Sequence, residues 1–157
     1  MKNKLWEFSG KSFYWLTWPL LALYIYRTSR TRVLVICGDE VLVVKGWHGT
    51  GSWELPGGGL HRKELPADGA IRELYEETGI SVTATDLQFL FSSPAKRHHG
   101  LSYKIFAYVL ELKTKPELTK QKLEITHLEW MHWQKLYDDP KTNKNLKDII
   151  SVWFKKV

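Results

Sequence analysis

One spacing between Gly58 and Ile80 constrains this chain more than any other feature. Gly58 is followed by five residues and Glu64, then by seven residues and the run Arg72-Glu73-Leu74-Tyr75-Glu76-Glu77-Thr78-Gly79-Ile80. Residues three and four positions apart lie on the same face of an α-helix, so Glu73, Glu76 and Glu77 would gather their carboxylates there. Such like-charge pairs destabilise a helix by about 0.2–0.5 kcal/mol each, and a hard cation bound by oxygen atoms removes that cost. The run therefore favours a metal-binding helix face, and the alternative is that these acids form only a solvated face.

The flanks of the run predict where this helix begins and ends. Pro66 suits a first helical position, because its missing N–H would be unpaired there anyway. Gly79 can end the helix in a left-handed conformation. Leu65 is a poor N-cap, so we expect tertiary contacts to hold the start of the helix. The positions that can form a buried apolar stripe are Ala67, Ile71 and Leu74.

All nine fixed positions from Gly58 to Ile80 match the signature of the Nudix hydrolases, Gly-x5-Glu-x7-Arg-Glu-U-x-Glu-Glu-x-Gly-U, where U is aliphatic. The preceding run, Trp53-Glu54-Leu55-Pro56-Gly57-Gly58-Gly59, resembles the Pro-Gly-Gly entry of that family, and its glycines allow close backbone approach. The resemblance implies an α/β fold, the Nudix-type α/β/α sandwich with a mixed β-sheet. It also implies a hydrolase that cleaves a diphosphate with the help of Mg²⁺ or Mn²⁺.

Carried over position by position, the resemblance implies a role for each residue of the motif. Glu73, Glu76 and Glu77 would be metal ligands, and Glu64 would contribute indirectly or through water. Arg72 would orient a glutamate through a charge-assisted hydrogen bond. Gly58 would supply a backbone contact near the metal.

The general base is expected outside the motif, with a glutamate of the motif as an alternative. In MutT-type members of the family, a glutamate six residues before the tryptophan of a Glu-Trp-Met sequence joins the metal site, and Glu124 stands six residues before Trp130 here. Glu124 is therefore the first candidate for the base. Glu129 lies inside an expected strand and is a weaker candidate, while Glu73 remains an alternative.

Substrate contacts are expected from two places. By the same resemblance, Arg97, in the charged run 96–99, and Asn143, near the C-terminal helix, could contact a nucleotide. The alternative for the charged run is a solvated loop. Trp47, Trp53 and Tyr103 could stack on a base or simply pack in the core.

Composition fits one folded domain. With 157 residues, of which 43% are hydrophobic, the chain can bury one substantial core. The formal net charge of +6 favours an anionic partner. We expect this partner to be a small nucleotide, with no specific nucleic acid partner. Cys37 is expected to be a small buried hydrophobe in a reducing, cytoplasmic compartment.

Hydrophobic periodicity and turn residues predict the remaining elements. A hairpin is expected to join its two strands through Gly38-Asp39-Glu40. A later strand is expected to end before Pro94. The expected strands are 32–36, 41–45, one within 81–92, 103–112 and 125–133, and the expected helices begin at 134 and span 143–156.

The N-terminal region is set apart as residues 1–30, before a hydrolase domain at 31–157. Residues 13–26 are 14 uncharged, mostly apolar and aromatic residues, interrupted by Pro19. As a helix they are too short for the roughly 30 Å hydrocarbon core of a bilayer. We expect this segment to pack on the domain or in a homodimer, and peripheral attachment to a membrane surface is the alternative.

Together these observations predict a metal-dependent pyrophosphohydrolase. It would cleave a nucleoside triphosphate, or another nucleoside diphosphate derivative, to a nucleoside monophosphate and a phosphate product. The alternative is a Nudix-derived module that binds a nucleotide or RNA without cleaving it. Such modules usually lose glutamates of the motif, and this chain keeps all of them, which favours the enzyme.

Overall fold

The structure is a computed structural model that describes residues 29–46, 51–96, 102–120 and 125–154. Its centre is a five-stranded sheet with the strand order β3-β4-β1-β2-β5. The strands are β1 (Ser29–Cys37), β2 (Glu40–Gly46), β3 (Gln88–Lys96), β4 (Ser102–Glu111) and β5 (Ile125–His132). The helices are α2 (Pro66–Thr78), α3 (Trp133–Asp138), α4 (Lys144–Phe154) and the short 3₁₀ helix η1 (Ala84–Asp86).

The sheet is mixed, because β1 and β4 are parallel while the other neighbouring strands are antiparallel. β1 and β2 form the expected antiparallel hairpin, in which Gly38 adopts a positive φ of 59°. β1 then runs parallel to β4, with Val33 opposite Tyr108. The chain between β2 and β4 contains α2, η1 and β3, so this long connection carries the helix with the predicted carboxylates.

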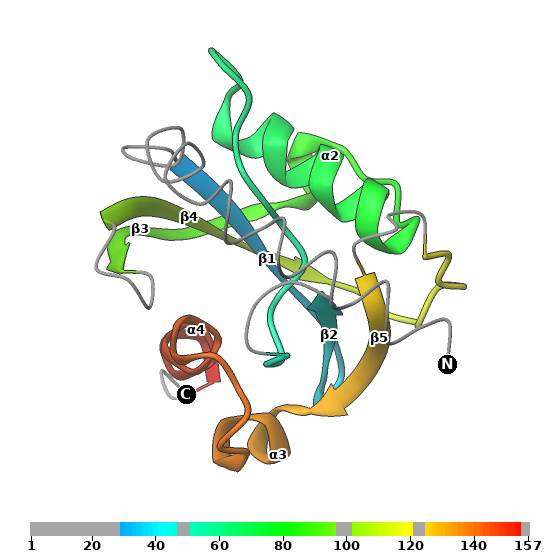
Figure 1. Cartoon of the computed structure of the whole chain (residues 1–157). Coiled ribbons are helices and arrows are strands. Elements are labelled where there is room, and N and C mark those ends of the chain that lie inside the picture. Colours follow the sequence, from blue (N-terminus) through cyan, green and yellow to red (C-terminus); the bar gives the residue numbers. More distant parts are fainter. Residues whose placement is uncertain (1–28, 47–50, 97–101, 121–124, 155–157) are drawn as a thin grey trace, which may run out of the picture.

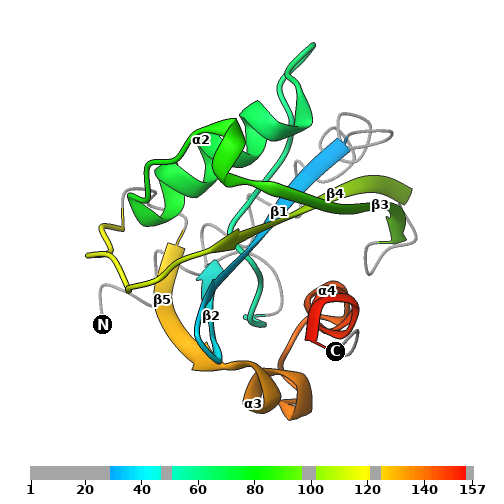
Figure 2. The ribbon, with the colours of Figure 1, turned by 180° about the vertical axis from the view of Figure 1, so that it is seen from behind.

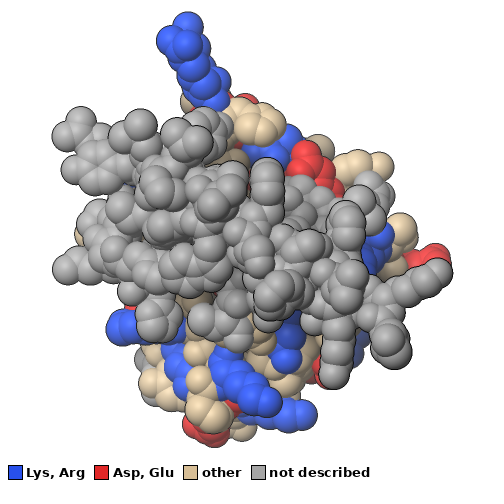
Figure 3. Space-filling model, in the orientation of Figure 1, with Lys and Arg blue, Asp and Glu red and all other residues tan. Residues whose placement is uncertain are grey.

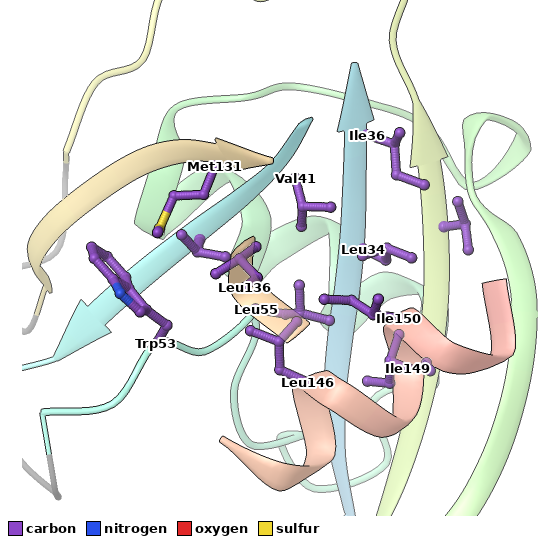
Figure 4. Packing of buried hydrophobic residues seen from close by; sticks show 13 residues of the cluster. Leu34, Ile36, Val41, Trp53, Leu55, Met131, Leu136, Leu146, Ile149 and Ile150 are labelled. Carbon is purple, nitrogen blue, oxygen red and sulfur yellow. The ribbon is translucent and has the colours of Figure 1, made fainter. Parts of the chain in front are cut away.

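Helices cover both faces of the sheet, as the two opposite ribbon views show (Figures 1 and 2). On one face, Ala70 and Leu74 of α2 pack with Val33, Val35 and Leu42 of the sheet. On the other face, α3 and α4 pack in a second cluster, drawn from close by in Figure 4. Its labelled members are Leu34, Ile36, Val41, Trp53, Leu55, Met131, Leu136, Leu146, Ile149 and Ile150. The predicted α/β/α sandwich with a mixed sheet is confirmed.

The predicted ends of α2 are also confirmed. The helix begins at Pro66, and Leu65 makes no side-chain cap. Gly79 ends it with a φ of 77° and donates its N–H to the carbonyl of Tyr75 at 2.8 Å. The N–H of Thr119 binds the carbonyl of Thr78 at 2.9 Å, so a distant loop also holds this end.

The strand predicted to end before Pro94 is different in the structure. Residues 84–86 form η1, and β3 continues through Pro94 to Lys96. Proline lacks a backbone donor and is tolerated on an edge strand. β3 is such a strand, because it stands at one end of the strand order, next to β4. The prediction was therefore wrong about this end, because sequence alone does not say which strand lies at the edge.

The N-terminal segment at 13–26 lies outside the described residues. β1 begins at Ser29, close to the predicted boundary between residues 30 and 31, which stays a prediction. Within the described ranges, every helix is too short or too polar to span a bilayer.

Candidate active site

Two glutamates of α2, Glu73 and Glu77, face the glycine-rich loop that precedes this helix, and Glu76 lies beside Arg72. Glu73 and Glu77 are buried, with 5% and 7% of their surface exposed, while the side chain of Glu76 is 36% exposed. The apolar stripe of α2 occupies the sheet, so these acids lie at its margin and do not form a fully solvated face. Burying carboxylates is costly unless they are paired or hydrogen-bonded, and the local contacts meet that need.

Arg72 joins the carboxylates into one network. Its Nε and Nη2 donate to the two carboxylate oxygens of Glu64 at 2.8 and 2.9 Å. Its Nη1 donates to Glu73 Oε1 at 2.8 Å and to Glu76 Oε2 at 3.5 Å. Nη2 also donates to the carbonyl of Gly59 at 3.0 Å. The guanidinium therefore links α2 to the glycine loop and to Glu64, a residue that lies before the helix.

The hydrogen bonds between Arg72 and Glu64 change the pKa of both side chains. The hydrogen bond from Arg72 lowers the pKa of Glu64 to about 2, from an ordinary value of 4.5. The same hydrogen bond raises the pKa of Arg72 above its ordinary value. The pair consequently stays charged across the whole neutral range. It keeps a fixed cation beside the buried carboxylate of Glu73.

The glycine loop approaches the carboxylates more closely than any other residue type would permit. The N–H of Gly57 donates to Glu77 Oε2 at 2.8 Å. A Cβ added to Gly58 would lie 2.5 Å from Glu73 Oε1, a distance that real Cβ atoms do not adopt. Gly57 has a φ of 136°, and a Cβ there would lie 2.3 Å from the carbonyl oxygen of Thr31. Glycine is thus required at position 57, and a side chain at position 58 would displace the Glu73 carboxylate.

The structure brings most of the predicted motif residues together. Glu64, Arg72, Glu73 and Glu76 share one network, and Glu77 and Gly58 meet at the glycine loop. Gly57, which binds Glu77, was not singled out in the sequence, although the Pro-Gly-Gly run was a signal for a close backbone approach. In the described ranges, no three Asp, Glu, His or Cys side chains already converge at metal-binding distance.

Other predicted residues lie elsewhere. Glu124 and Arg97 lie outside the described residues, and their assignments stay predictions. Asn143 caps α4, because its Oδ1 accepts the N–H of Asn145 at 2.8 Å. Glu129 lies in β5 opposite Val43 and is exposed. Trp53 is buried in the α4-side core, with Lys45 Nζ 3.8 Å from its ring centroid.

A cavity of about 60 Å³ lies between α4 and the β3–β4 edge of the sheet. Its lining combines apolar and polar side chains: Phe91, Ser93, Pro94, Ile105, Asn145, Asp148 and Ile149. Asn145 Nδ2 also donates to the hydroxyl of Tyr103 at 3.0 Å. Sequence reasoning placed the C-terminal contact at Asn143 and missed Asn145. The helical spacing 145, 148 and 149 was the available signal for residues sharing one face of α4.

The family model described as "NUDIX domain" matches residues 27–153. Nudix hydrolase 2 of Arabidopsis thaliana is 33% identical over 105 residues, which are 64% of this chain and 37% of that protein. Human diphosphoinositol polyphosphate phosphohydrolase 2 is 35% identical over 65 residues, or 41% of this chain and 36% of that protein. The chain therefore spans little more than a third of these two relatives.

Solved structures share the fold. A bifunctional NMN adenylyltransferase/ADP ribose pyrophosphatase from Francisella tularensis, complexed with AMP and a Mn ion, superimposes with a TM-score of 0.71 at 21% identity. That likeness covers 99% of this chain and 48% of the Francisella chain. The family match includes the glycine loop, α2 and the sheet that carries them. The chain belongs to the Nudix family.

Proposed function

We propose that this protein is a metal-dependent pyrophosphohydrolase that cleaves a nucleoside diphosphate derivative, such as a nucleoside triphosphate. The products would be a nucleoside monophosphate and a phosphate product. The observation that carries the proposal is the burial of Glu73 and Glu77 against the backbone of Gly57 and Gly58. Carboxylates that are buried against the backbone of a glycine loop are expected of a ligand-binding site. Acids on a solvated helix face need neither burial nor a close contact with backbone.

The donor set suits a hard divalent cation. Glu73, Glu76 and Glu77 offer carboxylate oxygens, the ligands that Mg²⁺ and Mn²⁺ prefer, and Glu64 could act through water. Such an ion would neutralise charge on the phosphoryl oxygens and lower the pKa of a bound water. The Francisella protein, of which this chain covers 48%, is complexed with AMP and a Mn ion, which agrees with this class of ligand.

The chain's own residues would do the remaining work. Arg72 would hold the Glu73 carboxylate in place through its 2.8 Å hydrogen bond, so that the oxygens need not reorganise when substrate binds. A carboxylate must take the proton of the attacking water, and Glu124 is the proposed base, with Glu73 as the alternative. The positive charge of Arg72 would offset the repulsion between these acids and an anionic substrate.

The cavity beside α4 is a fitting place for the nucleoside. Ile105, which lines it, pairs with Arg30 of β1, and Arg30 in turn bridges to Gly59 of the glycine loop. These pairings connect the sheet beside the cavity to the loop that faces Glu73 and Glu77. Asn145 and Asp148 would offer polar contacts to the base, and Arg97 and Asn143 remain proposed substrate contacts.

A nucleotide panel tests this function. The pure protein would be incubated with Mg²⁺ and nucleoside triphosphates, dinucleoside polyphosphates and nucleoside diphosphate sugars, and the products separated by ion-exchange chromatography. We expect at least one class to yield a nucleoside monophosphate, with no reaction in excess EDTA. A protein that binds a nucleotide from the panel but cleaves none would instead be a non-catalytic binding module.

A further inference from the structure

The glycine loop that faces the carboxylates is held on β1 by a set of hydrogen bonds. The N–H of Thr31 donates to the carbonyl of Gly58 at 2.9 Å, and the N–H of Val33 donates to the carbonyl of Pro56 at 2.9 Å. These two backbone bonds flank Gly57, whose carbonyl needs another donor. The position of Gly57 matters, because its N–H is the group that binds Glu77 at 2.8 Å.

The side chain of Arg32 supplies that donor. Its Nη1 donates to the carbonyl of Gly57 and, at 3.1 Å, to the carbonyl of Thr31. Its Nη2 donates to Glu54 Oε2 at 3.0 Å, and only 12% of the Arg32 side chain is exposed. Glu54 itself is tied to β2, since it exchanges both backbone hydrogen bonds with Val44 at 2.9 and 3.0 Å. The guanidinium thus connects two strands to the one glycine that binds Glu77.

We propose that Arg32, fixed by Glu54, is a positioning residue of the active site, an inference that rests on the proposed function. It holds the Gly57 carbonyl on the sheet, and this sets the direction of the Gly57 N–H toward Glu77. A planar guanidinium can bind two carbonyls and a carboxylate at once, whereas a lysine ammonium has no such fixed fork. Arg32 touches no carboxylate of α2 in the described contacts, so it acts through the loop.

Loss of Arg32 should affect one carboxylate in particular, that of Glu77, whose Oε2 accepts the Gly57 N–H. Hydrogen bonds to ligating groups orient them, and loss of such an outer contact commonly lowers metal affinity about 10–100-fold. When Arg32 is removed, Gly57 keeps its left-handed φ but loses the contact that fixes its carbonyl. The Gly57 N–H then samples other directions, and Glu77 loses a fixed orientation. A purely structural anchor would lower stability without this selective effect.

The test compares Arg32→Met, Arg32→Lys and Glu54→Gln with wild type, and uses Arg62→Met at an exposed arginine as the matched control. Manganese affinity, without substrate, is measured by electron paramagnetic resonance, and thermal unfolding reports stability. The Gly57 amide is followed by ¹⁵N NMR after assignment through Glu77→Gln, which perturbs the same hydrogen bond. Arg32→Ala with added guanidinium chloride at non-denaturing concentration tests chemical rescue.

We expect Arg32→Met to weaken Mn²⁺ binding about tenfold or more and to shift the Gly57 amide, with Arg62→Met unchanged in both. Glu54→Gln, which keeps Arg32 but loosens it, should show the same changes at smaller amplitude. Guanidinium should recover part of the affinity of Arg32→Ala. Should Arg32→Met fail to fold, Glu54→Gln and Arg32→Lys carry the comparison.

Two results separate this inference from the proposed function. If a folded Arg32→Met binds Mn²⁺ within twofold of wild type and leaves the Gly57 amide unmoved, the positioning role is wrong even when the wild type is an active enzyme. If the wild type binds no Mn²⁺, the proposed metal site fails, and the Gly57 amide still decides whether Arg32 orients that N–H. A drop in stability alone, with affinity and amide unchanged, also contradicts the inference.

Discussion

Among single residues, Arg72 has the largest share in keeping the buried carboxylates together. It contacts Glu64, Glu73 and Glu76 and also the carbonyl of Gly59. Glu64, Glu73 and Glu76 belong to the spacing that the sequence displays, so these members of the network could be predicted, whereas Gly59 is not one of its fixed positions. Its geometry could not, because Glu64 lies before the helix and reaches Arg72 only through the turn at 61–64.

The low pKa of Glu64 makes stability depend on pH in a defined window. Its folded pKa of about 2 lies below its ordinary 4.5, so the carboxylate stabilises the fold fully above pH 4.5. That contribution is lost as the pH falls from 4.5 toward 2. Glu64→Gln should therefore lower the free energy of unfolding at pH 7 by about 1.5–3 kcal/mol, the usual range for a charged hydrogen bond.

Urea unfolding of wild type and Glu64→Gln at pH 7, 5, 4 and 3 measures this. The gap between the two proteins should be constant from pH 7 to 5 and should narrow at pH 4 and 3. A gap that stays constant down to pH 3 would mean that Glu64 is not held at a depressed pKa by Arg72.

The role of Glu124 as the general base is tested by the rate of the reaction. Glu124→Gln should lower kcat by about 10²–10⁴-fold, the usual contribution of general acid–base catalysis. Thermal unfolding should change little, because the substitution preserves shape and only removes a charge. A pH–rate profile that is the same in wild type and Glu124→Gln would transfer the role of base to Glu73.

Arg32 and Gly57 illustrate what single-residue patterns cannot reveal. Arg32 lies 25 positions before the glycine that it contacts, and no spacing rule connects a β-strand arginine to a loop carbonyl. An alternating strand pattern would assign Arg32 to a solvent face. The loop that covers this side chain becomes visible only in three dimensions.

At the scale of elements, the site is a contact between a helix and a loop. Local signals predicted α2: the helical spacing of its acids, Pro66 at its start and Gly79 at its end. Burial of Glu73 and Glu77 depends instead on the loop at 56–59 lying along β1. The same limit explains the error at Pro94, since the edge position of β3 is a property of the whole sheet.

Two adjacent glycines of that loop give a matched pair of variants. In Gly58→Ala the new Cβ would lie 2.5 Å from Glu73 Oε1, whereas a Cβ at Gly59 has nothing within 4 Å. Gly58→Ala should displace the Glu73 carboxylate and weaken Mn²⁺ binding about tenfold or more, with a loss of stability of about 1–3 kcal/mol. Gly59→Ala should leave both quantities near wild type. Calorimetric Mn²⁺ titration and urea unfolding check the pair, and equal behaviour of the two variants would contradict the close approach.

In the whole molecule, the sheet separates α2 from α3 and α4. α2 and its carboxylates lie on one face, and the cavity beside α4 lies on the other (Figures 1 and 2). The space-filling view shows basic side chains at the turn before α2 and, mixed with acidic ones, over the lower helices (Figure 3). The net charge of +6 favours an anionic partner, and a small nucleotide in that role stays a prediction.

The N-terminal segment also has its effect at this scale. An apolar stretch like 13–26 is expected to be covered, because large exposed apolar patches mark interfaces. We propose that it packs on the domain or between two subunits. Deletion of residues 1–26 should lower the melting temperature or the solubility while Mn²⁺ affinity stays unchanged. Salt-sensitive flotation of the full-length protein with anionic liposomes, lost on deletion, would instead favour attachment to a membrane surface.

We propose that the carboxylates of α2 hold the ion that makes diphosphate cleavage possible. The most direct measurement is the initial rate of product formation, on a nucleotide from the panel, as a function of Mg²⁺ concentration for wild type, Glu76→Gln and Glu77→Gln. Both substitutions preserve shape and remove a charged oxygen ligand. We expect each to raise the Mg²⁺ concentration needed for half-maximal rate and to lower the maximal rate. Wild-type activity of Glu77→Gln at limiting Mg²⁺ would contradict the account.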